Sequence, residues 1–170
     1  MHIRSHILVA GALALTLLST LSSNAYAGHR LNHDAQFCNK VGSEGTFGVH
    51  YQGTISNTSA TQSLKVLCPV VRMAGLTTTG DAHVYATDRS RDYAIQCSFY
   101  DQKAYGQDWT WSNWKNSLGS GPNNYVTFTF GPYNSKDSWG GFHHFYCIIP
   151  PTDVDYGEST IGSYSTGTED

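Results

Sequence analysis

The chain has 170 residues, with 10 Lys and Arg against 13 Asp and Glu, a formal net charge of −3 and a mean hydropathy of −0.34. This slight excess of acid argues against the basic surface with which proteins neutralise nucleic-acid phosphates, so we predict no nucleic-acid partner. The length fits one domain, and because charged residues make up only 14% of the chain, neutral polar side chains must supply most of its solubility.

The first 27 residues have the layout of a secretory signal peptide. A basic start that contains Arg4 precedes a mostly apolar run from Ile7 to Leu21, and Ala25-Tyr26-Ala27 fits an A-x-A cleavage site. The apolar run is shorter than the ~20 residues that a membrane-spanning helix needs. We therefore predict a signal peptide at 1–27 and a single secreted domain at 28–170, periplasmic or extracellular, with no membrane insertion after cleavage.

The rest of the chain alternates between short runs of period-2 hydrophobicity and clusters of Gly, Asn, Ser and Thr. This alternation is typical of half-buried strands joined by turns, and no segment sustains helical periodicity. We predict an all-β fold, an antiparallel β-sandwich of jelly-roll-like or Greek-key type with about eight strands. The predicted strands are Phe47–Ile55, Leu64–Met73, Ala82–Thr87, Tyr93–Tyr100, Asp108–Trp114, Tyr125–Phe130, Phe142–Ile149 and Thr160–Thr166.

The four cysteines all follow the predicted signal peptide, and their even number in an exported chain favours two disulfides. Four cysteines allow three pairings. Alternation places Cys97 and Cys147 on mainly apolar faces of their strands, so we expect a Cys97–Cys147 bridge in the core. Elimination then leaves Cys38–Cys68, with Cys68 on the same face as Leu64.

An aromatic cluster is the first candidate for function. Indole rings stack on the C–H faces of sugars, and the neighbouring polar groups can bind hydroxyls, so the cluster fits a glycan platform or the interface with another exported protein. The alternative, which is the commoner role of such rings, is that they fill the core; exposure decides between the two. The candidate ligand-binding residues are Tyr105, Asp108, Trp109, Trp111, Asn113 and Trp114.

An acidic segment at 153–158 is the second candidate. Asp153, Asp155 and Glu158 are close enough in sequence to supply oxygen ligands to Ca²⁺, although the segment lacks the EF-hand pattern. A solvated acidic turn is the favoured interpretation, so we predict no cofactor and keep calcium as the alternative.

The histidines give no metal signature. His143 and His144 are neighbours on a predicted strand and therefore point to opposite faces. We expect His29 and His33 to lie in a mobile N-terminal tail, and we interpret the histidines as ordinary surface or packed residues rather than transition-metal ligands.

Several short motifs follow one another along the chain in an order that is typical of a known family. They are Asn57-Thr58-Ser59, Val66-Leu67-Cys68-Pro69-Val70-Val71-Arg72, Val84-Tyr85-Ala86-Thr87-Asp88, Cys97 in a strand, Tyr146-Cys147-Ile148-Ile149-Pro150-Pro151 and Ile161-Gly162-Ser163-Tyr164. This order resembles an uncharacterised family of small secreted bacterial disulfide-containing β-sandwich proteins. The resemblance implies a signal peptide, a β-rich fold and disulfides, and it implies no activity. Asn57-Thr58-Ser59 also matches a glycosylation sequon, which we interpret as a strand-end turn.

No hydrolase elbow, zinc-protease motif or nucleotide-binding loop occurs in the chain. The sequence therefore predicts a secreted, non-enzymatic binding or structural domain, with glycan recognition through the tryptophans as its preferred mechanism. Two alternatives remain: a self-assembling surface subunit that associates through an edge strand, and a small extracellular hydrolase. The hydrolase would need an acid pair drawn from Asp81, Asp88, Asp108 and Asp137.

Overall fold

The computed structural model describes residues 30–70, 78–102, 109–117, 124–131, 133–134 and 142–168. The predicted signal peptide lies outside these residues. Within them the chain is almost entirely β-structure, and the one helical element is a short 3₁₀ turn, η1 (Ala35–Phe37). No helix in the described part of the chain is long and apolar enough to cross a membrane.

The described strands form two antiparallel sheets. Sheet A has the order β10-β6-β13-β4-β3, with β1 also on β13 and β11 also on β6. Its strands are β1 (Arg30–Asp34), β3 (Phe47–Val49), β4 (Ile55–Asn57), β6 (Thr78–Asp88), β10 (Asn124–Phe130), β11 (Tyr133–Asn134) and β13 (Thr160–Thr168).

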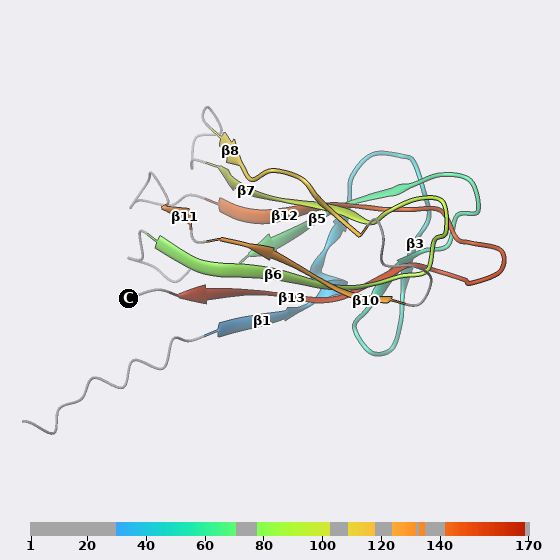
Figure 1. Ribbon diagram of the computed structural model, residues 1–170, viewed down its shortest axis with the longest axis horizontal. Helices are drawn as coiled ribbons and strands as arrows, with labels where there is room; N and C mark the ends of the chain where they lie inside the picture. Colours follow the sequence, from blue (N-terminus) through green and yellow to red (C-terminus); the bar gives the residue numbers. More distant parts are fainter. Residues whose placement is uncertain are drawn as a thin grey trace, which may run out of the picture.

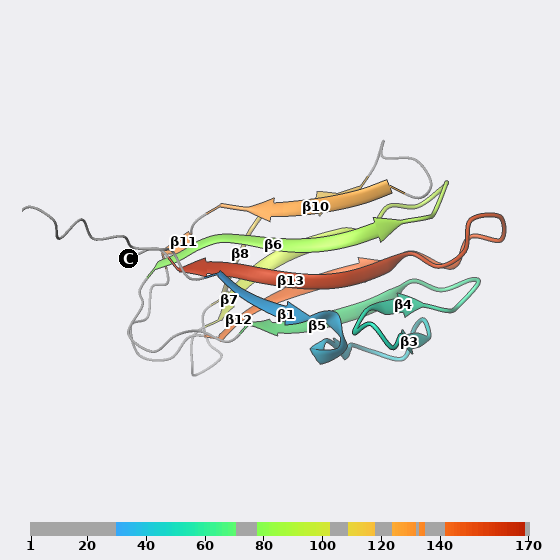
Figure 2. The same ribbon diagram turned by 90° about the horizontal axis from the view of Figure 1, so that it is seen from below.

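Sheet B has the order β2-β5-β12-β7-β8, with β9 also on β7. Its strands are β2 (Asn39–Lys40), β5 (Leu64–Val70), β7 (Gln96–Gln102), β8 (Trp109–Trp111), β9 (Lys115–Asn116) and β12 (Phe142–Ile149). Figure 1 shows the sandwich edge-on, with sheet B above sheet A, and Figure 2 looks onto the outer face of sheet A.

Each sheet buries the apolar residues of its period-2 pattern against the other sheet. In β12 the inward side chains from His143 to Ile149 alternate with partly exposed ones, and β5 alternates in the same way. Phe99, Phe130, Phe145 and Tyr164 are among the largest fully buried side chains. The all-β sandwich that the sequence predicts is therefore the fold observed.

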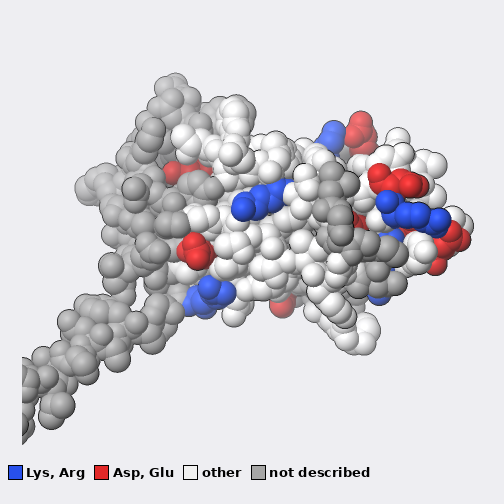
Figure 3. Space-filling view, in the orientation of Figure 1, with Lys and Arg blue, Asp and Glu red and all other residues white. Residues whose placement is uncertain are grey.

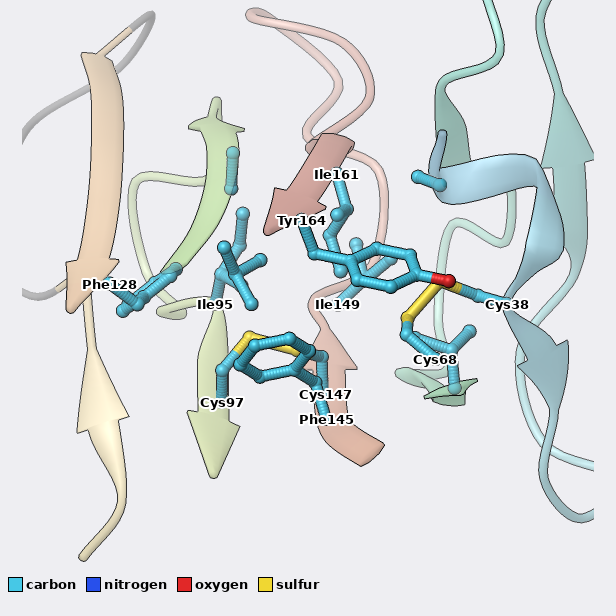
Figure 4. Close-up of a cluster of buried hydrophobic side chains, with 14 of the residues drawn as sticks. Cys38, Cys68, Ile95, Cys97, Phe128, Phe145, Cys147, Ile149, Ile161 and Tyr164 are labelled. Carbon is cyan, nitrogen blue, oxygen red and sulfur yellow. A yellow bond between two sulfur atoms is a disulfide. The ribbon is translucent and has the colours of Figure 1, made fainter. Parts of the chain in front are cut away.

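Two disulfides lie inside this core, and they join the cysteines that the sequence analysis paired (Figure 4). Cys97 and Cys147 face each other directly across β7 and β12, with their Cα atoms 4.2 Å apart. Cys38–Cys68 ties the segment before β2 to β5, with a Cα–Cα distance of 4.0 Å. The two bridges fasten sheet B at its centre and at one edge.

The structure corrects several predicted boundaries. The predicted strand Phe47–Ile55 is two strands, β3 and β4, because the chain turns at His50–Thr54 with Gly53 at φ +76°. Likewise, the described part of the predicted strand Asp108–Trp114 contains β8 alone, Asp108 lies outside the described residues, and a separate strand, β9, follows at Lys115–Asn116.

The N-terminal segment from residue 30 onward is not a tail. Arg30–Asp34 forms β1 along β13, and the imidazole of His33 stacks on the buried ring of Tyr164, with 5.1 Å between ring centroids. The expectation of a mobile tail is therefore wrong for His33, while His29 lies outside the described residues. The strand escapes detection because its sequence offers little hydrophobic alternation and a distant partner, β13, supplies its hydrogen bonds.

Candidate functional site

Five rings form a continuous aromatic face on the outside of sheet B. The residues of this aromatic face are Trp111, Tyr100, His144, Tyr146 and Trp114. Trp111, Tyr100 and His144 are directly opposite one another on the adjacent strands β8, β7 and β12, so their side chains form a row across the sheet.

The rings of the aromatic face contact one another in sequence. The Tyr100 ring lies parallel to the His144 imidazole, with 5.2 Å between centroids and 5° between planes. Trp111 lies 6.4 Å from Tyr100, and Tyr146 lies edge-on to Tyr100 at 6.1 Å. Trp114 packs edge-on against Tyr146 at 5.8 Å, so the half-buried rings hold the two indoles in place.

Trp111 and Trp114 are exposed to solvent and do not belong to the core. The side chain of Trp111 is 54% exposed and that of Trp114 is 43% exposed. The interpretation that the tryptophans fill the core is therefore wrong for these two residues. Large apolar side chains left this exposed on one continuous aromatic surface are typical of a binding site.

Hydrogen bonds from Ser112 fix the segment that carries both tryptophans. The Ser112 N–H donates to the Phe99 carbonyl at 2.8 Å, and the Phe99 N–H donates to the Ser112 hydroxyl at 2.9 Å. Because Ser112 is buried while its neighbours are exposed, it anchors the chain to β7 between Trp111 and Trp114. The positions of the indoles are thus set by the backbone as well as by ring contacts.

The aromatic face is uncharged at neutral pH. Burial, with a further contribution from neighbouring His143, lowers the pKa of His144 below its usual value of 6.5, so the imidazole is neutral at pH 7. Burial likewise raises the pKa of Tyr100 above 10, which keeps its hydroxyl protonated. The five rings therefore offer apolar faces and neutral polar groups, while the charged Lys65, which interacts with Tyr146, lies beside them on β5.

The structure describes only part of the predicted aromatic cluster. Trp111 and Trp114 lie together on the aromatic face, and Asn113 is exposed between them. Tyr105 and Asp108 lie outside the described residues, and only the backbone of Trp109 is described, in β8.

Sequence reasoning missed Tyr100, His144 and Tyr146. The signal was present, because each alternates with a buried residue of the same strand, as Tyr146 does with Phe145 and Cys147.

The acidic segment between β12 and β13 is a tight turn with protein partners. One oxygen of the Asp153 carboxylate accepts the N–H groups of Asp155 and Tyr156, and hydrogen bonds of this kind, the Asp155 bond above all, lower the pKa of Asp153. The Asp155 carboxylate pairs with the guanidinium of Arg91, which also lies over the Tyr156 ring.

Glu158, the third candidate calcium ligand, lies beside His50, with 3.4 Å between Nε2 and Oε2. Within the described residues no cluster of three or more His, Cys, Asp or Glu side chains is placed to hold a metal ion. Figure 3 shows that charged side chains gather at the end of the molecule that carries this turn and are sparse elsewhere on the described surface in that view.

Two of the four candidate acids of a hydrolase cannot form a pair. Asp88 is buried and accepts hydrogen bonds from the Ser90 N–H and the Ser117 and Ser159 hydroxyls. Asp81 is exposed, and since the two acids are seven positions apart on one strand, an odd number, their side chains point to opposite faces of sheet A. Asp108 and Asp137 lie outside the described residues.

The two stacked antiparallel sheets form a β-sandwich, and the solved structures that share this fold include xylan-binding modules. The chain is similar to a structure described as the xylan-binding module CBM15, with a TM-score of 0.55 and 12% identity over 84% of this chain and 97% of that one. It is also similar to the CBM22-1 xylan-binding domain from Paenibacillus barcinonensis, with a TM-score of 0.53 and 13% identity over 85% of this chain and 97% of that one. At these identities the likeness shows a shared fold.

No protein-family model matches the chain, and no curated protein matches it. The β-sandwich and the two disulfides that the family resemblance implied are present in the structure. Membership of that family, and its secreted bacterial origin, stay predictions.

Proposed function

We propose that this protein is a non-enzymatic glycan-binding domain and that it binds its ligand on the aromatic face of sheet B. The observation that carries the proposal is the exposure of Trp111 and Trp114 on one surface, joined by three supporting rings. Flat indole faces are complementary to the C–H surfaces of sugar rings, and neighbouring Asn113 supplies an exposed amide for hydroxyl groups.

The fold supports the same function. Two solved structures that share this fold are described as xylan-binding, and the similarity covers 97% of each of them. Xylan itself is one member of the ligand class we propose, which is an extended polysaccharide with exposed C–H faces.

Rigidity of the aromatic face favours binding. The Cys97–Cys147 bridge lies directly beneath it, between the strands that carry Tyr100, His144 and Tyr146. Because a rigid surface loses little conformational entropy when the ligand arrives, more of the contact energy appears as affinity.

The proposal includes export of the chain. Disulfides persist in oxidising compartments, and the first 27 residues have the layout of a signal peptide. We accordingly place the protein outside the cell or in the periplasm, where polysaccharides are the accessible ligands.

The test is a binding survey with a matched pair of variants. The full chain is expressed with its own N-terminal segment, purified in oxidised form and titrated with xylan, cellulose, chitin, mannan and pectin. We expect one or more to bind, and Trp111→Ala and Trp114→Ala each to weaken that binding by about tenfold or more, as for aromatic residues at the centre of an interface. Tyr93→Ala, which removes an exposed ring outside the aromatic face, should leave binding unchanged.

Two results would contradict the proposal. Glycan binding that survives in the folded double variant Trp111→Ala, Trp114→Ala would place the ligand elsewhere. Failure of every polysaccharide to bind, together with Trp111-dependent capture of another exported protein, would assign the aromatic face to a protein partner.

A further inference from the structure

A groove of about 670 Å³ lies on the outer face of sheet A, on the opposite side of the sandwich from the aromatic face. Its volume is in the range of sites that bind small ligands, about 300–1,000 Å³. The floor is formed by the outward side chains of β6, β10 and β13, among them Thr87, Thr127 and Thr160. Figure 2 looks onto this face of the sheet.

A β-bulge lies in the floor of the groove. The pairing of β13 with β6 shifts register between Ile161 and Ser163, which leaves Gly162 as the extra residue. A Cβ atom at Gly162 would lie 3.7 Å from the Tyr85 carbonyl oxygen and 3.9 Å from Thr54 Cγ2. The backbone therefore tolerates a side chain at this position, and its absence keeps the groove hollow.

Walls rise on both sides of this floor. The turn between β3 and β4, which includes His50 and Tyr51, lines one side, and Figure 1 shows this connection projecting below sheet A. Tyr125, at the start of β10, lines the other side and is 89% exposed. An exposed tyrosine on each wall gives the groove two rings beside a hydroxyl-rich floor.

The polar groups of the groove suit a neutral ligand. Glu158 and Arg89 both line it, so its charges are mixed and no single sign dominates. A carboxylate only accepts hydrogen bonds and a guanidinium only donates them, whereas a threonine hydroxyl does both. A ligand that matches this lining must offer many groups that donate and accept, as the hydroxyls of a sugar do.

From this geometry we propose that the groove is a second binding site, which takes a short neutral oligosaccharide. The site is independent of the aromatic face, because the two lie on different sheets with the packed core between them. In this proposal the aromatic face presents exposed rings to an extended polysaccharide, whereas the open groove holds a single short chain between its two sides. The domain thus binds two saccharide ligands at once, one on each side.

The experiment measures trisaccharide binding in a variant that lacks the two exposed tryptophans of the aromatic face. A second substitution then fills the groove in that same background. In the Trp111→Ala, Trp114→Ala background, neutral trisaccharides derived from xylan, cellulose, mannan and chitin are titrated by calorimetry. We expect binding to remain and to fall by about tenfold or more on adding Gly162→Leu, because the leucine side chain occupies the floor. Tyr125→Ala should also weaken trisaccharide binding, because it removes a ring that lines the groove. The variant should still fold, since this side chain is exposed and does not belong to the core.

Gly131→Leu is the matched control. A Cβ at Gly131 meets no atom within 4 Å, and the residue lies outside the groove. Equal binding by the Gly162→Leu and Gly131→Leu variants, or no trisaccharide bound in the double-tryptophan background, would overturn the second site. Preference for an acidic trisaccharide such as trigalacturonate would overturn the neutral ligand class. Every variant in this experiment lacks the two tryptophans. Its outcome therefore does not depend on whether the aromatic face of sheet B binds a glycan, and the two proposals are tested separately.

Discussion

Replacement of Asn57 by alanine is the most informative test of how the two sheets are held together. Asn57 is the last residue of β4 in sheet A, and its side chain is fully buried. Its amide contacts five backbone groups, one of which, the Ile149 carbonyl, belongs to the last residue of β12 in sheet B, and three carbonyls share its two N–H hydrogens. These groups are the N–H of Thr46 and Ser59 and the C=O of Gln62, Ile149 and Pro150.

The expected loss follows from which of these groups water can reach after the change. The hydrogen bonds to Ile149 and Pro150, at 3.2 and 2.9 Å, are buried, so both carbonyls lose a partner that solvent does not replace. The other three are partly buried and regain water. With about 1–3 kcal/mol for each stranded carbonyl and smaller losses for the rest, Asn57→Ala should lower the free energy of unfolding by about 3–5 kcal/mol. Asn57→Asp should be at least as harmful, because it sets a carboxylate against three carbonyls.

Equilibrium urea unfolding of the oxidised protein, followed by tryptophan fluorescence, measures this change. Asn39→Ala is the control, because Asn39 is exposed and donates only one long bond, 3.5 Å, to the Phe37 carbonyl. We expect that control to stay within about 0.5 kcal/mol of wild type. A loss of less than about 1 kcal/mol for Asn57→Ala would refute the reasoning, since it would mean that the buried carbonyls are satisfied without the amide.

Two further predictions concern the core. The Cys97→Ala, Cys147→Ala double variant opens a loop of sequence separation 50 and should lose about 4 kcal/mol of unfolding free energy in the same urea assay; a loss below about 1 kcal/mol would contradict the loop-entropy argument. Burial, with a smaller contribution from the Asp34 carboxylate, raises the pKa of Tyr164 to about 12. Since an unfolded tyrosine ionises near pH 10, this residue's contribution to stability is complete below pH 10 and is lost as the pH rises to about 12. Tyr164→Phe should remove that part of the alkaline loss in a pH series of unfolding curves, and an unchanged pH profile would show that the hydroxyl ionises equally in both states.

The sandwich and its disulfides could be predicted because they depend on local alternation. Cys97 and Cys147 each sit among residues that repeat with period 2, so the sequence already places both in the core. β1 could not be predicted in this way, since Arg30–Asp34 carries a single aliphatic residue, Leu31, and exists because β13 pairs with it. A short strand that is held by pairing with a distant strand need not show a hydrophobic pattern in its own sequence.

The aromatic face was only partly predictable. Three tryptophans within six residues drew attention to the cluster, but a strand with rings on either face gives no indication of which face is buried. The contrast of Phe99 with Tyr100, and of Phe145 with Tyr146, marks the outward side once both strands are aligned. The groove was beyond sequence reasoning, because its lining comes from β6, β10, β13 and the β3–β4 turn, which are far apart in the chain.

The neutrality of the five rings bears on how ligand binding at the aromatic face would depend on salt concentration. Interactions between exposed charges are screened beyond about 8 Å at physiological ionic strength, but contacts between rings and C–H groups do not depend on such fields. Because His144 is uncharged at neutral pH, ring contacts rather than ion pairs would supply the binding energy on this face, and little of that energy would be screened by salt. For the glycan binding proposed here we therefore expect an affinity that changes little between low and high salt, in contrast to proteins that depend on phosphate neutralisation.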